Sequence, residues 1–136
     1  MRNFCQHACR VSVLFMFLVA MVGCGGNSAP ICKVTAIKVF PATATISHTA
    51  PPPGNTQHFD AFESAATPGC LFAQSNLTSA TWSVSDTTNV SISNVQGATF
   101  GTATCNGATS GAATVTATVP AGDGTSVTNT ASLNCN

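Results

Sequence analysis

Apolar and polar residues alternate along most of this chain, and the alternation predicts β-strands. In AATVTATVP, the residues Ala113, Val115, Ala117 and Val119 fall on one face and threonines fall on the other. A period of two is the spacing of side chains that share one face of a strand. From residue 31 onward no stretch carries apolar residues at helical spacing, so we expect an all-β domain.

The same alternation, interrupted by turn residues, predicts about seven short strands. The residues expected to face inward are Ile37 and Val39, Phe59 and Ala61, Trp82 and Val84, Val90 and Ile92, Phe100, the four named above, and Val127, Ala131, Leu133 and Cys135. Pro41 is expected to end or bend the first strand, because proline has no N–H to donate. Seven short strands in about a hundred residues favour a two-sheet sandwich over residues 32–136.

The first thirty residues have a different pattern. After Arg2 and Arg10, an uncharged apolar run of 13 residues extends from Val11 to Gly23. The run is too short to span a bilayer as a helix, and a basic start with small residues at the end is typical of a secretory signal. We therefore predict a signal peptide over residues 1–23.

The end of this run, Met21-Val22-Gly23-Cys24, resembles a bacterial lipoprotein signal, in which the cysteine becomes the lipidated N-terminus. The resemblance implies that Cys24 carries acyl chains such as palmitate. It also implies a lipid-anchored protein of the cell envelope, at the outer membrane or the cell surface. Residues 24–31 would then be the lipidated cysteine and a flexible tether, by their glycine and serine content. The alternative is cleavage nearby and release of a secreted protein.

Charge narrows the choice of partner. Beyond the leader, two lysines stand against four acidic residues, and only 6% of the whole chain is charged. Because there is no basic patch to hold phosphates, nucleic acid is not expected as a partner.

Four cysteines follow Cys24, and an even number in an exported protein predicts two disulfides. If the strands alternate in direction, Cys32 and Cys70 lie at one pole of the sandwich, and Cys105 and Cys135 at the other. The poles are roughly 17 to 25 Å apart, whereas a disulfide needs Cα atoms within about 7 Å. We favour Cys32–Cys70 with Cys105–Cys135. The alternative, Cys70–Cys105 with Cys32–Cys135, requires the long loop to fold down the side of the sandwich.

Catalytic and metal-binding patterns are weak. The bases available beyond the leader are His48 and His58, and no glycine-framed serine accompanies them. His58 and Asp60 share a strand face, so their side chains can touch, but two ligands do not make a metal site. The wide cysteine spacing is not that of zinc ligands, and Asp123 in GDGT is expected in a turn. We expect no enzyme activity, cofactor or metal; the alternative is a secreted β-sandwich enzyme or inhibitor that uses the His48/His58 region.

Leu71 and Phe72 are the candidates for ligand contact. They follow Cys70 in the irregular segment 64–79, and loops of that length are usually functional or cross-linked. The pair either forms an apolar contact patch held by a disulfide or tucks over the open end of the sandwich as a plug.

Taken in order, the segments IKVFPATATI, GNTQHFDAF, ATWSVSD, GAATVTATV and TASL resemble the bacterial immunoglobulin-like domains of the group-2 type. The resemblance runs from Val34 to Leu133, and the long loop and the four cysteines depart from it. It implies an immunoglobulin-like sandwich that serves as a stalk, spacer or adhesive module at bacterial surfaces, with no catalytic residues. As a partner besides the membrane we expect a protein or glycan at the cell surface. We therefore expect an envelope lipoprotein whose single domain is a binding, adhesive or structural module.

Overall fold

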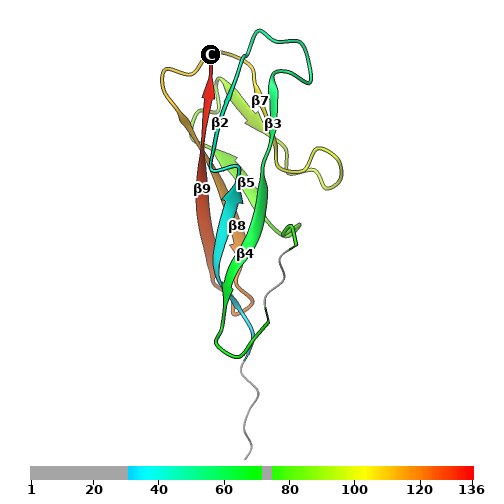
Figure 1. Cartoon of the computed structure of the whole chain (residues 1–136), viewed down its shortest axis with the longest axis vertical. Helices are drawn as coiled ribbons and strands as arrows, with labels where there is room; N and C mark the ends of the chain where they lie inside the picture. Colours follow the sequence, from blue (N-terminus) through cyan, green and yellow to red (C-terminus); the bar gives the residue numbers. More distant parts are fainter. Residues whose placement is uncertain (1–30, 72–74) are drawn as a thin grey trace, which may run out of the picture.

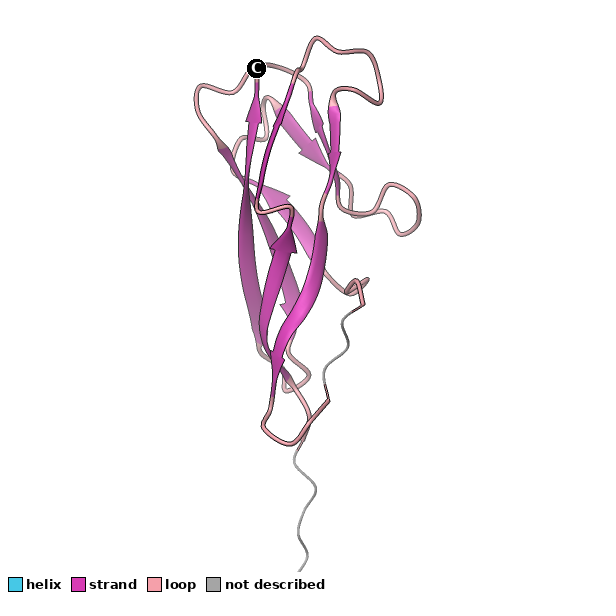
Figure 2. Cartoon of the chain, in the orientation of Figure 1, coloured by secondary structure: helices cyan, strands magenta, loops and turns pink. Residues whose placement is uncertain are grey.

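The computed structural model describes residues 31–71 and 75–136, and this part of the chain is all-β, without a helix. The predicted signal peptide, Cys24 and Phe72 lie outside the described residues. Figures 1 and 2 show an elongated molecule built of strands. The strands are β1 (Val34–Phe40), β2 (Thr43–Ile46), β3 (Thr56–His58), β4 (Asp60–Ala66), β5 (Thr81–Val84), β6 (Val90–Ile92), β7 (Thr102–Cys105), β8 (Ala113–Pro120) and β9 (Ser126–Cys135).

These nine strands are the seven predicted ones, two of which are divided. The first predicted strand is divided into β1 and β2 around Pro41, and the second into β3 and β4 around Phe59. β4 continues to Ala66, so the irregular segment is shorter than predicted. The prediction placed Phe100 in the fifth strand, but this residue lies in the turn before β7, although its side chain is buried.

The strands form two layers. Hydrogen bonding divides them into three sheets, β1-β4, β3-β7-β6 and β2-β9-β8-β5. The first two continue into each other between β3 and β4 and make one layer, and the third makes the other. Only Phe59 separates β3 from β4, and its N–H donates to the carbonyl of Gly101 over 2.9 Å. The predicted β-sandwich is therefore confirmed.

Pro41 marks the point at which the chain changes layers. β1 pairs with β4 as far as the Phe40–Asp60 pair, and β2 then pairs in parallel with β9, from Thr43 opposite Ser132 to Ile46 opposite Cys135. The Phe40–Pro41 bond is cis. Because proline cannot donate to a ladder, the predicted bend is where pairing with β4 ends.

The core between the layers is apolar. Its buried residues include nearly all of the predicted inward set; Val84, Ile92 and Val127 are only partly buried and pack against it. Trp82 and Phe100 meet edge to face, with ring centroids 6.4 Å apart. Gly101 lies beside them with φ of +72°, where a Cβ would collide with the Phe59 carbonyl oxygen, so this position needs glycine.

An asparagine side chain covers the open edge of β5. The Asn94 amide accepts from the Trp82 N–H over 2.6 Å and donates to the Trp82 carbonyl over 3.0 Å. These two bonds take the place of a neighbouring strand, which is one way in which natural sheets protect an edge.

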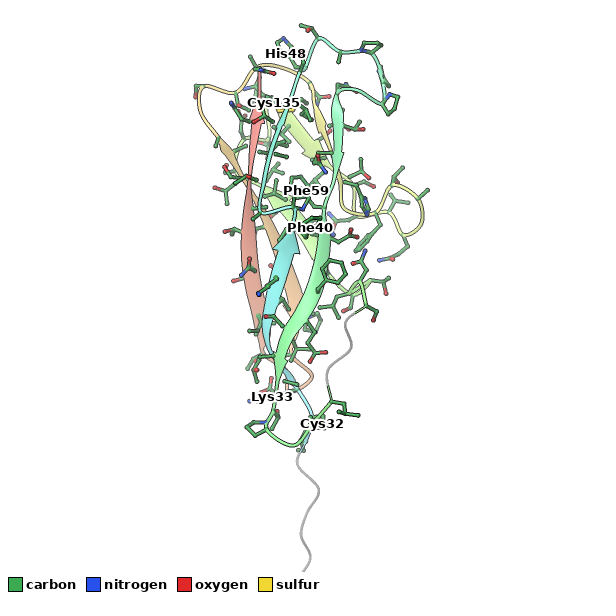
Figure 3. The ribbon with its side chains drawn as sticks, in the orientation of Figure 1. Cys32, Lys33, Phe40, His48, Phe59 and Cys135 are labelled. Carbon is green, nitrogen blue, oxygen red and sulfur yellow. A yellow bond between two sulfur atoms is a disulfide. The ribbon has the colours of Figure 1, made fainter. Side chains whose placement is uncertain are left out.

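Both favoured disulfides are present, one at each end of the molecule. Cys32 and Cys70 have Cα atoms 5.6 Å apart, and Cys105 and Cys135 have Cα atoms 5.8 Å apart. Figure 3 shows Cys32 near one end of the long axis and Cys135 near the other. We name these ends the Cys32 pole and the Cys135 pole.

Candidate functional site

The Cys32 pole presents two exposed aliphatic side chains. Leu71 is fully exposed and Ile31 is 79% exposed, and each directly adjoins one of the two bridged cysteines. The exposure of Leu71 excludes the plug for this residue, and its role in ligand contact stays a prediction. Phe72, its predicted companion, lies outside the described residues.

A turn after β4 places Cys70 against Cys32. The Thr67 N–H donates to the Lys33 carbonyl over 3.1 Å, and the Cys70 N–H donates to the Thr67 carbonyl over 2.9 Å, which closes a turn from Thr67 to Cys70. Within this turn Gly69 has a φ of +86°, a conformation that glycine adopts without steric cost. The TPGC sequence is therefore a tight turn, and Leu71 follows it at the Cys32 pole.

A shallow depression of about 320 Å³ lies beside this turn. Its lining residues come from both layers and from the two bridged segments: Cys32, Lys33, Val34, Glu63, Ala66, Leu71, Pro120, Ala121 and Gly122. The Val34 N–H donates to the Ala121 carbonyl over 3.1 Å, which joins β1 to the end of β8. The depression is thus a mostly apolar hollow at the pole, with Leu71 among its lining residues.

An ion pair ties the start of the domain to the turn between β8 and β9. Lys33 Nζ lies 2.9 Å from Asp123 Oδ2, and Asp123 Oδ1 accepts from the Thr125 N–H over 3.0 Å. The Thr125 hydroxyl and the Lys33 ammonium, in that order, hold the pKa of Asp123 well below its ordinary value of 3.8. The prediction that Asp123 lies in a turn is confirmed.

The predicted contact between His58 and Asp60 is present on the outer face. His58 Nε2 lies 3.0 Å from Asp60 Oδ1, and His58 Nδ1 lies 3.2 Å from Thr102 Oγ1. When Nε2 carries the proton and donates to Asp60, Nδ1 accepts the Thr102 hydroxyl proton. The Asn76 amide nitrogen also donates to Asp60 Oδ1.

Sequence reasoning missed Thr102 and Asn76. Thr102 is the cross-strand partner of His58 in the β3–β7 register, and Asn76 is bridged to Phe62 from the loop after β4. A correct strand alignment would have identified Thr102. Nothing in the sequence distinguished Asn76 from other loop asparagines.

A second depression, of about 340 Å³, adjoins this cluster and is lined by His58, Asn76, Thr78, Gln96, Gly97, Ala98 and Phe100. The Gln96 amide donates to the Thr78 carbonyl over 2.7 Å, which joins the two loops that border it. Asn76 Oδ1 is buried without a hydrogen-bond partner in the described structure. The arrangement offers hydroxyl, amide and imidazole groups to a small polar ligand.

The two predicted histidines have different partners. At the Cys135 pole, His48 Nδ1 lies 2.7 Å from the Asn136 carbonyl oxygen, and the His48 N–H donates to the same oxygen over 2.9 Å. Figure 3 shows His48 at this end. His58 instead contacts β4 and β7, so the described hydrogen bonds do not join the histidines into one site.

Three further findings bear on function. Within residues 31–71 and 75–136, no three histidine, cysteine, aspartate or glutamate side chains gather as metal ligands. In the same residues no helix has the length and apolar character needed to cross a bilayer. Comparisons with protein-family models, curated proteins and solved structures give no match for this chain.

Proposed function

We propose that this protein is an envelope lipoprotein, attached to a membrane through an acylated Cys24, whose β-sandwich is a binding, adhesive or structural module. The observation that carries the proposal is the pairing of the cysteines. The four cysteines that follow Cys24 bind one another in two bridges, so Cys24 is the cysteine beyond the leader that these bridges do not use. Lipidation gives that thiol a role, and two disulfides are typical of proteins that fold outside the cytosol.

The shape of the domain supports the same proposal. The chain enters the sandwich at the Cys32 pole, and Cys24 precedes Cys32 by eight residues. Eight residues reach at most about 29 Å when fully extended. The Cys32 pole therefore stays near the bilayer, and the Cys135 pole and the outer face with His58 are available to a protein or glycan partner.

The immunoglobulin-like resemblance agrees with this proposal. The described residues form the two layers around an apolar core that a sandwich requires. We propose the group-2 type on the sequence segments alone.

Metabolic labelling with an alkyne analogue of palmitate tests the anchor. In bacterial cells, the wild-type protein should be labelled and should remain with the membranes, and Cys24→Ser should be neither labelled nor retained. Cys9→Ser is the matched control, because that cysteine belongs to the predicted leader and its loss should leave labelling intact. Equal labelling of the wild type and Cys24→Ser would refute the proposal.

The alternative function, an enzyme or inhibitor, is favoured by one observation: Thr102, His58 and Asp60 form a line of hydrogen bonds like that of a nucleophile, a base and an orienting acid. The His58 side chain lies on an exposed sheet face, where water screens the charges that such a line would stabilise. Conversion of His58 to Ala separates the two functions: loss of an activity supports the enzyme, and unchanged binding to envelope fractions supports the module.

A further inference from the structure

The Cys32 pole concentrates exposed apolar surface that no described part of the chain covers. The exposed large apolar residues of the described structure are Ile31, Phe40, Leu71 and Val95, and two of these four lie at this pole. Ile31 and Leu71 are 40 positions apart in the sequence. Their neighbours Cys32 and Cys70 are bridged, however, with Cα atoms 5.6 Å apart. The disulfide therefore brings two chain segments, each with an exposed aliphatic side chain beside its cysteine, to the same pole, and we call this end of the molecule the aliphatic tip.

The charges near this tip are already paired. Lys33 and Asp123 neutralise each other over 2.9 Å. Glu63, the remaining ionisable side chain that lines the depression, also has an interaction partner. Because Lys33 and Asp123 neutralise each other, electrostatic attraction to anionic lipids would contribute little to binding at this pole.

The course of the chain identifies what covers the tip. Ile31 is the last residue of the predicted tether, and Cys24 precedes it by seven residues, which reach at most about 25 Å when fully extended. If Cys24 is acylated, the bilayer is the apolar phase closest to this pole at all times. Two aliphatic side chains then suffice, because the anchor makes their insertion an intramolecular step at high effective concentration.

We propose that Ile31 and Leu71 insert into the interfacial layer of the membrane that holds Cys24, so that the domain is seated on its Cys32 pole. This inference rests on the proposed function. The Cys32–Cys70 bridge positions Leu71 for the contact, and the lipid surface is the occupant of the apolar tip. Seating orients the Cys135 pole and His48 away from the lipid, toward a partner.

Tryptophan scanning tests the seating with the full lipoprotein. Leu71→Trp is reconstituted into phosphatidylcholine vesicles that contain lipid brominated high on the acyl chains. Val95→Trp is the matched control, because Val95 is 70% exposed but lies in the loop between β6 and β7. Trp82 is buried in both variants and gives a common background.

We expect the added fluorescence of Leu71→Trp to shift to the blue and to be quenched by the brominated lipid, and that of Val95→Trp to show neither change. Equal quenching of the two variants, or none in either, overturns the seating. Near-UV circular dichroism of Trp82 establishes that both variants are folded. Adding Cys32→Ala and Cys70→Ala to Leu71→Trp should abolish the quenching.

Flotation of the same vesicles separates this inference from the proposed function. Wild-type protein that floats while Leu71→Trp stays unquenched refutes the seating and leaves the anchor intact. Wild-type protein that does not float refutes both. A protein partner that covers the tip instead of lipid would be absent from these vesicles, and Leu71→Trp would then remain unquenched.

Discussion

Loss of the Cys105–Cys135 bridge should destabilise the domain more than loss of the Cys32–Cys70 bridge. Cys105 and Cys135 are each 1% exposed and belong to the core. The bridge closes a chain segment of 30 positions, and the loss of that closure costs about 3.6 kcal/mol in the chain-entropy account. Removing two buried sulfur atoms leaves a void that costs about 1 kcal/mol for each atom. The double variant Cys105→Ala with Cys135→Ala should therefore lose about 5 to 6 kcal/mol.

The Cys32–Cys70 bridge is the matched control. Its separation of 38 positions gives about 3.9 kcal/mol by the same relation, slightly more than the buried bridge. Cys32 is exposed, so little packing is lost with it. Chain entropy alone predicts a nearly equal loss for the two double variants, and burial predicts that the Cys105/Cys135 variant loses about 1 to 2 kcal/mol more.

Urea unfolding followed by Trp82 fluorescence measures both losses, because Trp82 is buried in the native core. Domains of this size have about 5 to 15 kcal/mol of stability in total. A Cys105/Cys135 variant that is unfolded without urea, beside a folded Cys32/Cys70 variant, agrees with the expected order. The reverse order, or equal losses, would refute the claim that the Cys105–Cys135 bridge is part of the core packing.

Substitutions also test three local features of the domain: the Asp123 ion pair, the close approach at Gly101 and the cover on the β5 edge. The pKa of Asp123 is lowered first by the Thr125 hydroxyl, so its stabilising contribution is complete above the ordinary value of 3.8 and is lost as the pH falls through the lower folded value. Asp123→Asn should remove this acid dependence from urea midpoints measured between about pH 2 and pH 5. Gly101→Ala should cost about 3 kcal/mol or more in thermal unfolding, whereas Gly97→Ala, at positive φ but in open space, should cost about 1 kcal/mol; equal costs would contradict the collision described for position 101. Asn94→Ala should cost about 1 to 3 kcal/mol and should promote self-association in size-exclusion chromatography; an unchanged monomer of full stability would show that the β5 edge needs no cover.

The alternation of apolar and polar residues predicted well which side chains face the core, because each side chain of a strand can point to only one of two faces. Ala113 to Val119 could point in only two directions, and the apolar set had to face inward. Pro41 likewise predicted a bend, since a missing N–H is a local property. The parallel pairing of β2 with β9 could not be predicted, because it depends on how two sheets close around a core.

The two bridges were predictable because strand direction determines which ends of the strands share a pole. The exposure of Leu71 was not, since the direction of a loop side chain depends on the turn before it and on the opposite layer. In the outer-face cluster, His58 and Asp60 were predicted together because residues two apart share a strand face. Thr102 comes from a distant strand and depends on its register with β3.

Intact-mass spectrometry of the protein extracted from membranes tests the central claim most directly. We predict a chain that begins at Cys24 and carries the additional mass of acyl groups. An unmodified chain, or one that begins at another residue, would contradict the lipid anchor and, with it, the seating of the Cys32 pole on the bilayer.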